Sequence, residues 1–197
     1  MELYIARHGE TEYNAAHRIQ GNGIDSPLTG NGIAQAITLG KSLEGIAFDA
    51  VYSSPLKRAT DTVKHAFNNK YTPILDERII EIGLGVMEGM YWTDAAKDFP
   101  EAANRLSDPV NYVPPPNGEA LTDMLIRVSE FMDDVAKAGH QKVFVLSHGY
   151  TCRVFQACTL GKTLEAIEQA QEYGNCQIAR YHFKDDNWEF VNILDKP

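Results

Sequence analysis

The strongest constraint on the fold is a series of short apolar runs that stop abruptly at polar or charged residues. Residues 143–146 (Val-Phe-Val-Leu) form the clearest run, and continuous apolar runs of this length are typical of strands buried on both faces of a parallel sheet. Residues 3–6, 48–52 and 72–75 predict three further strands. A chain built in this way must cover both faces of its sheet with other elements.

Helical patterns lie between these runs. Apolar residues at helical spacing follow Thr29, a residue type that caps helix N-termini, and continue to about residue 43. A second helix is expected to open at Ser53-Ser54-Pro55, with Pro55 in its first turn. Residues 121–138 predict an amphipathic helix and Gly149 begins another. Strands alternating with helices predict an α/β fold, a three-layer, doubly wound and mostly parallel sheet with helices on both faces.

The rest of the chain fits one domain. A length of 197 residues suits a single domain spanning residues 1–197. The less regular, aromatic-rich segment at about 88–118 predicts a small helical, lid-like insertion in that domain. Residues 177–183 and 188–193 flank a polar turn and predict a terminal hairpin.

Charge limits the partners. The formal net charge of -9 argues against nucleic acid and anionic membranes, since both are negatively charged. The N-terminus does not resemble a signal peptide, and three irregularly spaced cysteines predict neither a disulfide framework nor a zinc cluster. We therefore expect a cytoplasmic protein. A phosphorylated ligand would need a local concentration of positive groups.

The residues that follow the predicted strands provide such a concentration. Arg7 and His8 end the first strand, Arg58 lies one turn into the helix after the second, Glu81 follows the third, and His148 ends the central run. The carboxyl ends of parallel strands meet at one edge of a sheet, where ligands bind in open α/β folds. A neutral imidazole is a competent nucleophile near pH 7, arginines bind phosphate oxygens, and a carboxylic acid can protonate a leaving group. The pattern therefore indicates phosphoryl transfer.

Longer segments around these residues resemble the histidine phosphatase superfamily, which is also called phosphoglycerate mutase-like. A single Arg-His-Gly tripeptide would be weak, but further motifs follow in the family's order over about residues 3–153. These are Arg7-His8-Gly9-Glu10-Thr11, Gln20-Gly21 with Ser26-Pro27-Leu28-Thr29, Ser53-Ser54-Pro55-Leu56-Lys57-Arg58-Ala59, Glu81-Ile82-Gly83 and Ser147-His148-Gly149.

The resemblance implies a role for each matching residue. His8 would be the nucleophile that is phosphorylated, and Glu81 the acid. The phosphoryl oxygens would be held by Arg7, Arg58 and His148. The resemblance further implies that Asn14, Gln20, Gly21 and Gly149 line the substrate site. It implies no metal and no cofactor.

Two points stay open at this level. The acid could be Glu77 or Glu88 instead of Glu81. The sequence also departs from the family at Ala120, where a serine is common and a helix cap is weakened, and at Tyr150, which replaces a small residue and could narrow the pocket.

The function that the sequence favours is hydrolysis of phosphoric monoesters on small phosphorylated metabolites, by a histidine acid-type phosphatase that acts through a phosphohistidine. Two alternatives are a cofactor-dependent phosphoglycerate mutase and a non-catalytic module that binds phosphorylated ligands. A mutase needs extra basic residues over the pocket, and only Lys97 and Arg105 lie between Glu81 and Glu119. The sequence does not distinguish among these metabolites. It does not fix the oligomeric state either, and a homodimer is one possibility.

Overall fold

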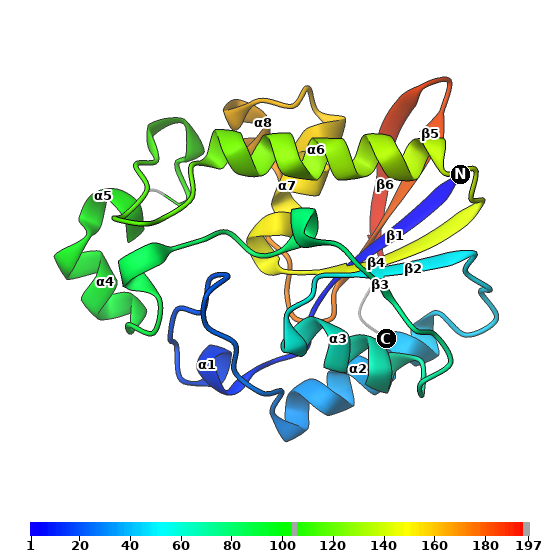
Figure 1. Cartoon of the computed structure of the whole chain (residues 1–197), viewed down its shortest axis with the longest axis horizontal. Helices are drawn as coiled ribbons and strands as arrows, with labels where there is room; N and C mark the ends of the chain where they lie inside the picture. The colour runs from blue at the N-terminus through cyan, green and yellow to red at the C-terminus, as the bar shows by residue number, and fades with distance from the viewer. Residues whose placement is uncertain (104–105, 195–197) are drawn as a thin grey trace.

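The computed structural model describes residues 1–103 and 106–194, so Arg105 lies outside the described residues. Figure 1 shows a central sheet with helices on both of its sides. The elements in chain order are β1 (Glu2–Arg7), α1 (Glu12–Ala15), α2 (Gly30–Ser42), β2 (Ala50–Ser53), α3 (Lys57–Ala66), β3 (Ile74–Leu75), η1 (Glu77–Ile79), η2 (Gly85–Met87), α4 (Trp92–Asp98), α5 (Pro100–Ala103), η3 (Pro109–Asn111), α6 (Leu121–Lys137), β4 (Lys142–Ser147), α7 (Gly149–Thr159), α8 (Leu164–Gln169), β5 (Ile178–Lys184) and β6 (Asn187–Leu194).

The sheet is mixed. Its strands lie in the order β3-β2-β4-β1-β5-β6. The first four are parallel to one another, whereas β5 pairs antiparallel with β1 and β6 antiparallel with β5. The carboxyl ends of β1, β2 and β4 therefore meet at one edge. The predicted fold class is confirmed, and the terminal hairpin extends the parallel part on one side.

Alternate residues of the central strands enter different cores, as the two-residue period of a strand requires. Leu3 and Ile5 of β1 belong to the core under α6, α7 and α8, whereas Tyr4 and Ala6 belong to the core under α2 and α3. In β4, Phe144 joins the second of these cores. Both faces are thus covered, which explains why β4 is apolar from Val143 to Leu146.

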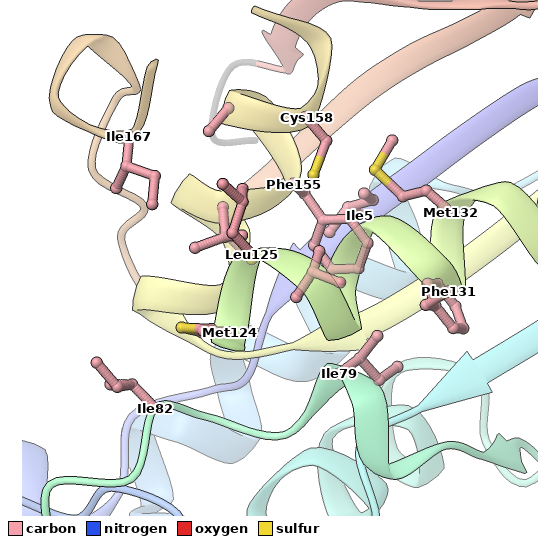
Figure 2. Close-up of a cluster of buried hydrophobic side chains, with 14 of the residues drawn as sticks. Ile5, Ile79, Ile82, Met124, Leu125, Phe131, Met132, Phe155, Cys158 and Ile167 are labelled. Carbon is pink, nitrogen blue, oxygen red and sulfur yellow. The ribbon is translucent and has the colours of Figure 1, made fainter. Parts of the chain in front are cut away.

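The larger core lies between the sheet and α6 (Figure 2). Phe131 of α6 and Phe155 of α7 pack edge to face, with ring centroids 5.8 Å apart, and Ile5 and Ile79 lie beside them. Both phenylalanine rings are completely buried. Burial of a side chain of this size contributes about 1.5–3 kcal/mol, so this contact is a major anchor of the upper layer.

The observed starts of three helices can be compared with the starts predicted from their capping residues. Thr29 caps α2 by accepting a hydrogen bond from the Gly32 N–H, as predicted. Ala120 precedes α6 without any side-chain cap, as its substitution for serine implied. The prediction for Pro55 was wrong. The helix begins at Lys57 with Leu56 as its N-cap residue, whereas the Ser54 N–H continues the pairing of β2 by one residue and bonds the Leu146 carbonyl.

The segment at about residues 88–118 carries α4, α5 and η3, and Figure 1 shows α4 and α5 at one end of the molecule. The first residues of the segment pair with the loop that follows α1. The Gly89 N–H donates to Ile19 O, and the Ile19 N–H donates to Met90 O. Within the described residues, no helix is long and apolar enough to cross a membrane.

Candidate active site

The ends of β1 and β4 bring the two histidines together. The His8 N–H donates to the Ser147 carbonyl over 3.0 Å, which continues the parallel ladder by one residue. His148 follows directly and its ring lies edge to face with the His8 ring, at a centroid distance of 5.2 Å. His8 is 2% exposed and His148 is fully buried. The sequence therefore predicted this juxtaposition correctly.

The His8 ring is fixed in one tautomer. Its Nδ1 lies 2.7 Å from the Gly9 carbonyl oxygen. A carbonyl cannot donate, so Nδ1 carries the hydrogen and the neutral ring holds its lone pair on Nε2. Burial lowers the pKa of His8 well below its usual value, and the positive charges of Arg58 and Arg7 lower this pKa further. A neutral imidazole with a free Nε2 is the nucleophilic form.

His148 is held from the other side by Ser54. Its Nε2 lies 2.7 Å from Ser54 Oγ, which also accepts the Leu56 N–H. Because that N–H occupies one lone pair of Oγ, the hydroxyl hydrogen is free to point at Nε2. In that arrangement the hydrogen of the His148 ring lies on Nδ1. Burial, followed by the charge of Arg58, lowers the pKa of His148 well below its usual value.

Two arginines border the histidines, and each is anchored by backbone carbonyls. Arg58 donates to Gly21 O over 2.7 Å and pairs with Asp25 at 3.1 Å. Arg7 donates to Tyr173 O over 2.7 Å. Arg58 is 1% exposed, so its charge is strongly desolvated and depends on Asp25 and on any anion that binds.

Several buried nitrogen atoms near the two histidines have no hydrogen-bond partner in the described part of the chain. Among the described residues, the buried Nε of Arg7, the Nε of Arg58 and Nδ1 of His148 have no hydrogen-bond partner. Buried polar groups are nearly always paired in native proteins, so these donors are available to a bound ligand. Here they belong to two cations and an imidazole, which is a suitable set for an oxyanion.

The loop after His8 is held by close backbone packing. A Cβ on Gly9 would lie 2.5 Å from the carbonyl oxygen of Gly32, so no side chain fits there. The Gly9 N–H donates to Oγ1 of Thr62, whose hydroxyl donates to Arg58 O. Contacts with α2 and α3 therefore fix the loop, and the close approach of Gly32 explains the glycine at position 9.

A cavity of about 380 Å³ opens above these groups. Its walls include eight of the predicted site residues, namely Arg7, His8, Asn14, Gln20, Gly21, Arg58, Glu81 and Gly149. The ninth, His148, does not belong to the wall, but its ring contacts the ring of His8, which does. The side chain of Gln20 is also committed to loop structure, because it donates to Thr11 Oγ1 and accepts from Ser26 Oγ.

Glu81 lies in the cavity wall, where its side chain contacts the first residues of α7. Its Oε1 accepts hydrogen bonds from the Thr151 N–H at 3.2 Å and the Thr151 hydroxyl at 3.1 Å, and its Oε2 from the Tyr150 N–H at 3.3 Å. The carboxyl group is thus placed by the same helix that begins after His148. This contact orients an acidic group toward the space above His8.

The two alternative glutamates are placed elsewhere. Glu88 accepts hydrogen bonds from the backbone N–H groups of Asn22, Gly23 and Leu84, at 2.9–3.1 Å, and so ties two loops together. Glu77 is exposed on η1. Neither side chain belongs to the cavity wall. The geometry therefore favours Glu81 over both.

Sequence reasoning missed several residues that build the site. Arg127 of α6 donates to Arg78 O and Ile80 O and pairs with Glu119 at 2.6 Å, which supports the loop that ends at Glu81. The segment at residues 173–177 clamps the end of β1 through bonds to Arg7 and His8. No motif in the sequence marks Arg127 or residues 173–177.

Comparison with known proteins decides the family. Residues 3–196 match the family described as "Histidine phosphatase superfamily (branch 1)". The chain belongs to this superfamily. The match confirms the resemblance that the motifs carried, and with it the expectation of phosphatase chemistry through a histidine.

Relatives of this histidine phosphatase carry phosphatase names. The metal-independent phosphoserine phosphatase of Arabidopsis thaliana is 32% identical over 95% of this chain and 78% of its own length. Phosphoserine phosphatase 1 of Hydrogenobacter thermophilus is 34% identical over 83% and 78%. A phosphoserine phosphatase variant from Entamoeba histolytica, solved with phosphoserine, has a TM-score of 0.81 and 26% identity over 98% of this chain and 95% of that one. Other relatives, 29% identical, bear phosphoglycerate mutase names.

Proposed function

We propose that this histidine phosphatase hydrolyses small phosphomonoesters through a covalent phosphohistidine at His8, with no metal ion and no other cofactor. Its single domain of residues 1–197 would take a small phosphorylated metabolite as its ligand, rather than nucleic acid or a membrane. A cytoplasmic location agrees with this chemistry.

One observation carries the proposal. The unpaired nitrogen atoms of Arg7, Arg58 and His148 gather around a histidine whose Nε2 is free to attack. A phosphoryl group in transfer spreads negative charge over three equatorial oxygens. Three donors already fixed in a buried site would stabilise that charge without reorganisation, which is the largest contribution available to such a site.

The first step transfers the phosphoryl group to the enzyme. His8 Nε2 forms a bond to phosphorus while the bond from phosphorus to the ester oxygen breaks. The departing oxygen takes a proton from Glu81, so an alcohol leaves and Glu81 becomes a carboxylate. The Gly9 carbonyl stabilises the positive charge that develops on the imidazole, through the hydrogen on Nδ1.

The second step returns the enzyme to its starting state. A water molecule gives a proton to Glu81 and attacks phosphorus, the P–N bond breaks, and inorganic phosphate leaves. Because burial lowers the pKa of His8, the nucleophile stays neutral in mildly acidic solution. This supports the finer proposal of an acid-type phosphatase, whose activity persists in mild acid.

Substrate size and charge follow from the cavity. A volume of about 380 Å³ suits a small metabolite and is at the low end for ligand pockets. The phosphoserine phosphatase names of the relatives make O-phosphoserine the first substrate to test. Lys97 on α4, one of the two basic residues between Glu81 and Glu119, does not belong to the cavity wall, and the mutase alternative is tested directly by the experiment below.

The deciding experiment is a rapid-quench burst with O-phosphoserine and p-nitrophenyl phosphate. We expect an acid-labile, base-stable phosphoenzyme in the wild type and none in His8→Ala. Interconversion of 2- and 3-phosphoglycerate, assayed in parallel, would instead indicate a mutase. Phosphate binding without any turnover would indicate a binding module, and full turnover in His8→Ala would exclude the nucleophile assignment.

A further inference from the structure

The cavity has charged groups that phosphoryl transfer does not use. Besides Arg7, Arg58 and Glu81, its wall contains Arg153 and Glu172. Arg153 is on α7, one turn beyond Glu81's contacts with that helix, and Glu172 lies between α8 and Tyr173. A positive and a negative side chain therefore border the same space as the nucleophile.

Arg153 is a buried cation without an anion. It is 8% exposed, and among residues 1–103 and 106–194 no carboxylate forms an ion pair with it. Its Nη1 donates to Leu106 O at 3.3 Å and its Nη2 to Ile167 O at 3.1 Å, while its buried Nε has no partner. Charged side chains are almost never buried unless they are paired.

A purely structural role does not account for Arg153. The two carbonyls satisfy two of the five N–H groups and provide only partial negative charges. The Tyr150 ring beneath the guanidinium, 5.0 Å from it, attracts the cation but does not neutralise it. A buried Nε without a partner among the described residues also occurs in Arg7 and Arg58, the two arginines at the phosphoryl end, and in Arg180, which does not belong to the cavity wall.

Glu172 has the complementary property. Its side chain is exposed at the cavity, and no hydrogen bond or ion pair joins it to another of the described residues. It lies next to Tyr173, whose carbonyl anchors Arg7. A carboxylate in this position borders the cavity on the side of Arg7, which would bind the phosphoryl group.

We propose that Arg153 and Glu172 form an amino-acid subsite, in which Arg153 binds the carboxylate and Glu172 the ammonium group of a phosphorylated amino acid. The inference rests on the proposed phosphatase function and names the substrate class for it. A planar guanidinium matches a carboxylate through paired hydrogen bonds. The preferred substrates are then phosphomonoesters of short hydroxyamino acids.

Three matched substrates separate the two contacts. O-phosphoethanolamine lacks only the carboxylate of O-phosphoserine, and 3-phosphoglycerate has a hydroxyl in place of its ammonium. We expect wild-type kcat/KM for O-phosphoserine to exceed that for O-phosphoethanolamine by about 10- to 100-fold, since a charged hydrogen-bonded group contributes that much. The preference over 3-phosphoglycerate is expected to be smaller, about 5-fold, because Glu172 is exposed.

Two variants test the residues. Arg153→Gln should lower kcat/KM for O-phosphoserine and 3-phosphoglycerate by about 10-fold or more, mainly through KM, and leave O-phosphoethanolamine within about 3-fold. Glu172→Gln should lower O-phosphoserine and O-phosphoethanolamine alike and spare 3-phosphoglycerate. Arg18→Gln is the matched control, because Arg18 is another arginine of the cavity wall, held by two bonds to Gly89 O. Its loss should affect the three esters equally.

Turnover of p-nitrophenyl phosphate and phosphorylation of His8 report on the proposed function independently of this subsite. If both persist in the wild type while O-phosphoserine and O-phosphoethanolamine have equal kcat/KM, the subsite is refuted and the phosphatase stands. Equal losses on all three esters in Arg153→Gln would also refute it and leave a structural role. If Arg153→Gln does not fold, Arg153→Lys replaces it, and an unchanged substrate ratio there contradicts paired hydrogen bonding.

Discussion

The two buried histidines make a quantitative prediction about stability in acid. The pKa of His8 and that of His148 are both lowered well below the usual value of about 6.5, chiefly by burial and then by Arg58. The unfolded chain therefore binds protons in mild acid that the native protein does not. Stability is complete above about pH 6.5 and falls as the pH decreases toward the folded-state pKa values.

The size of the effect follows from the unfolded state. If the rings stay neutral in the native protein, protonation of one unfolded histidine stabilises the unfolded chain by about 1.4 kcal/mol at pH 5.5 and about 0.2 kcal/mol at pH 7. The difference is about 1.2 kcal/mol for each ring. Two rings lower the free energy of unfolding by about 2.5 kcal/mol between pH 7 and pH 5.5.

Urea denaturation in phosphate-free buffer at several pH values measures this loss. His8→Asn removes one of the two rings, so its stability should fall by about 1.2 kcal/mol less than that of the wild type over the same range. Carboxylates also titrate in acid, but they contribute equally to both proteins and cancel in the difference. His17→Asn is the matched control, because the His17 ring is exposed and asparagine tolerates the positive φ of 53° at this position.

Parallel pH profiles for the wild type and His8→Asn would refute the reasoning. That result would mean that His8 becomes charged in the native protein as readily as in the unfolded chain. The nucleophile would then be protonated in mild acid, and acid-type activity could not be explained by its burial.

Three further predictions concern single side chains. Glu88→Ala should lower the free energy of unfolding by about 2–3 kcal/mol, and the melting temperature by about 5–10 °C, because three backbone N–H groups lose a charged acceptor; an unchanged melting curve would contradict this. Ser54→Ala should lower kcat about 10-fold with little change in KM, because the His148 ring loses the contact that orients it, and Ser54→Thr should restore part of the rate. Glu81→Gln should slow O-phosphoserine about 100-fold or more but p-nitrophenyl phosphate less than about 10-fold, since only a poor leaving group needs the proton. Equal slowing of both esters would assign the acid elsewhere.

The sequence predicted the parts of the site that follow strands directly. Arg7, His8 and His148 come at the ends of β1 and β4, so a correct strand assignment places them without further information. Arg58 lies in the first turn of α3. Its predicted place in the site was therefore right, although the helix begins two residues later than predicted. These positions depend on local patterns, which a single sequence shows.

Long-range contacts were not predictable in this way. The bond between Ser54 and His148 joins residues 94 positions apart, and Asp25 reaches Arg58 from a loop with no regular pattern. Tyr173 contributes a backbone carbonyl, which any residue type could supply. Arg153 and Glu172 resemble ordinary helix and loop charges until the fold brings them to one cavity.

The clamp at residues 173–177 has a consequence for synthesis of the enzyme. The carbonyl of His8 accepts a hydrogen bond from Asn175, 167 residues later, and β1 lies between β4 and β5. At about 5–20 residues per second, the ribosome needs roughly 10–30 s to supply that partner. A nascent chain therefore carries its nucleophile long before the residues that hold it in place, so the active site is complete only after residues 173–177 have been synthesised.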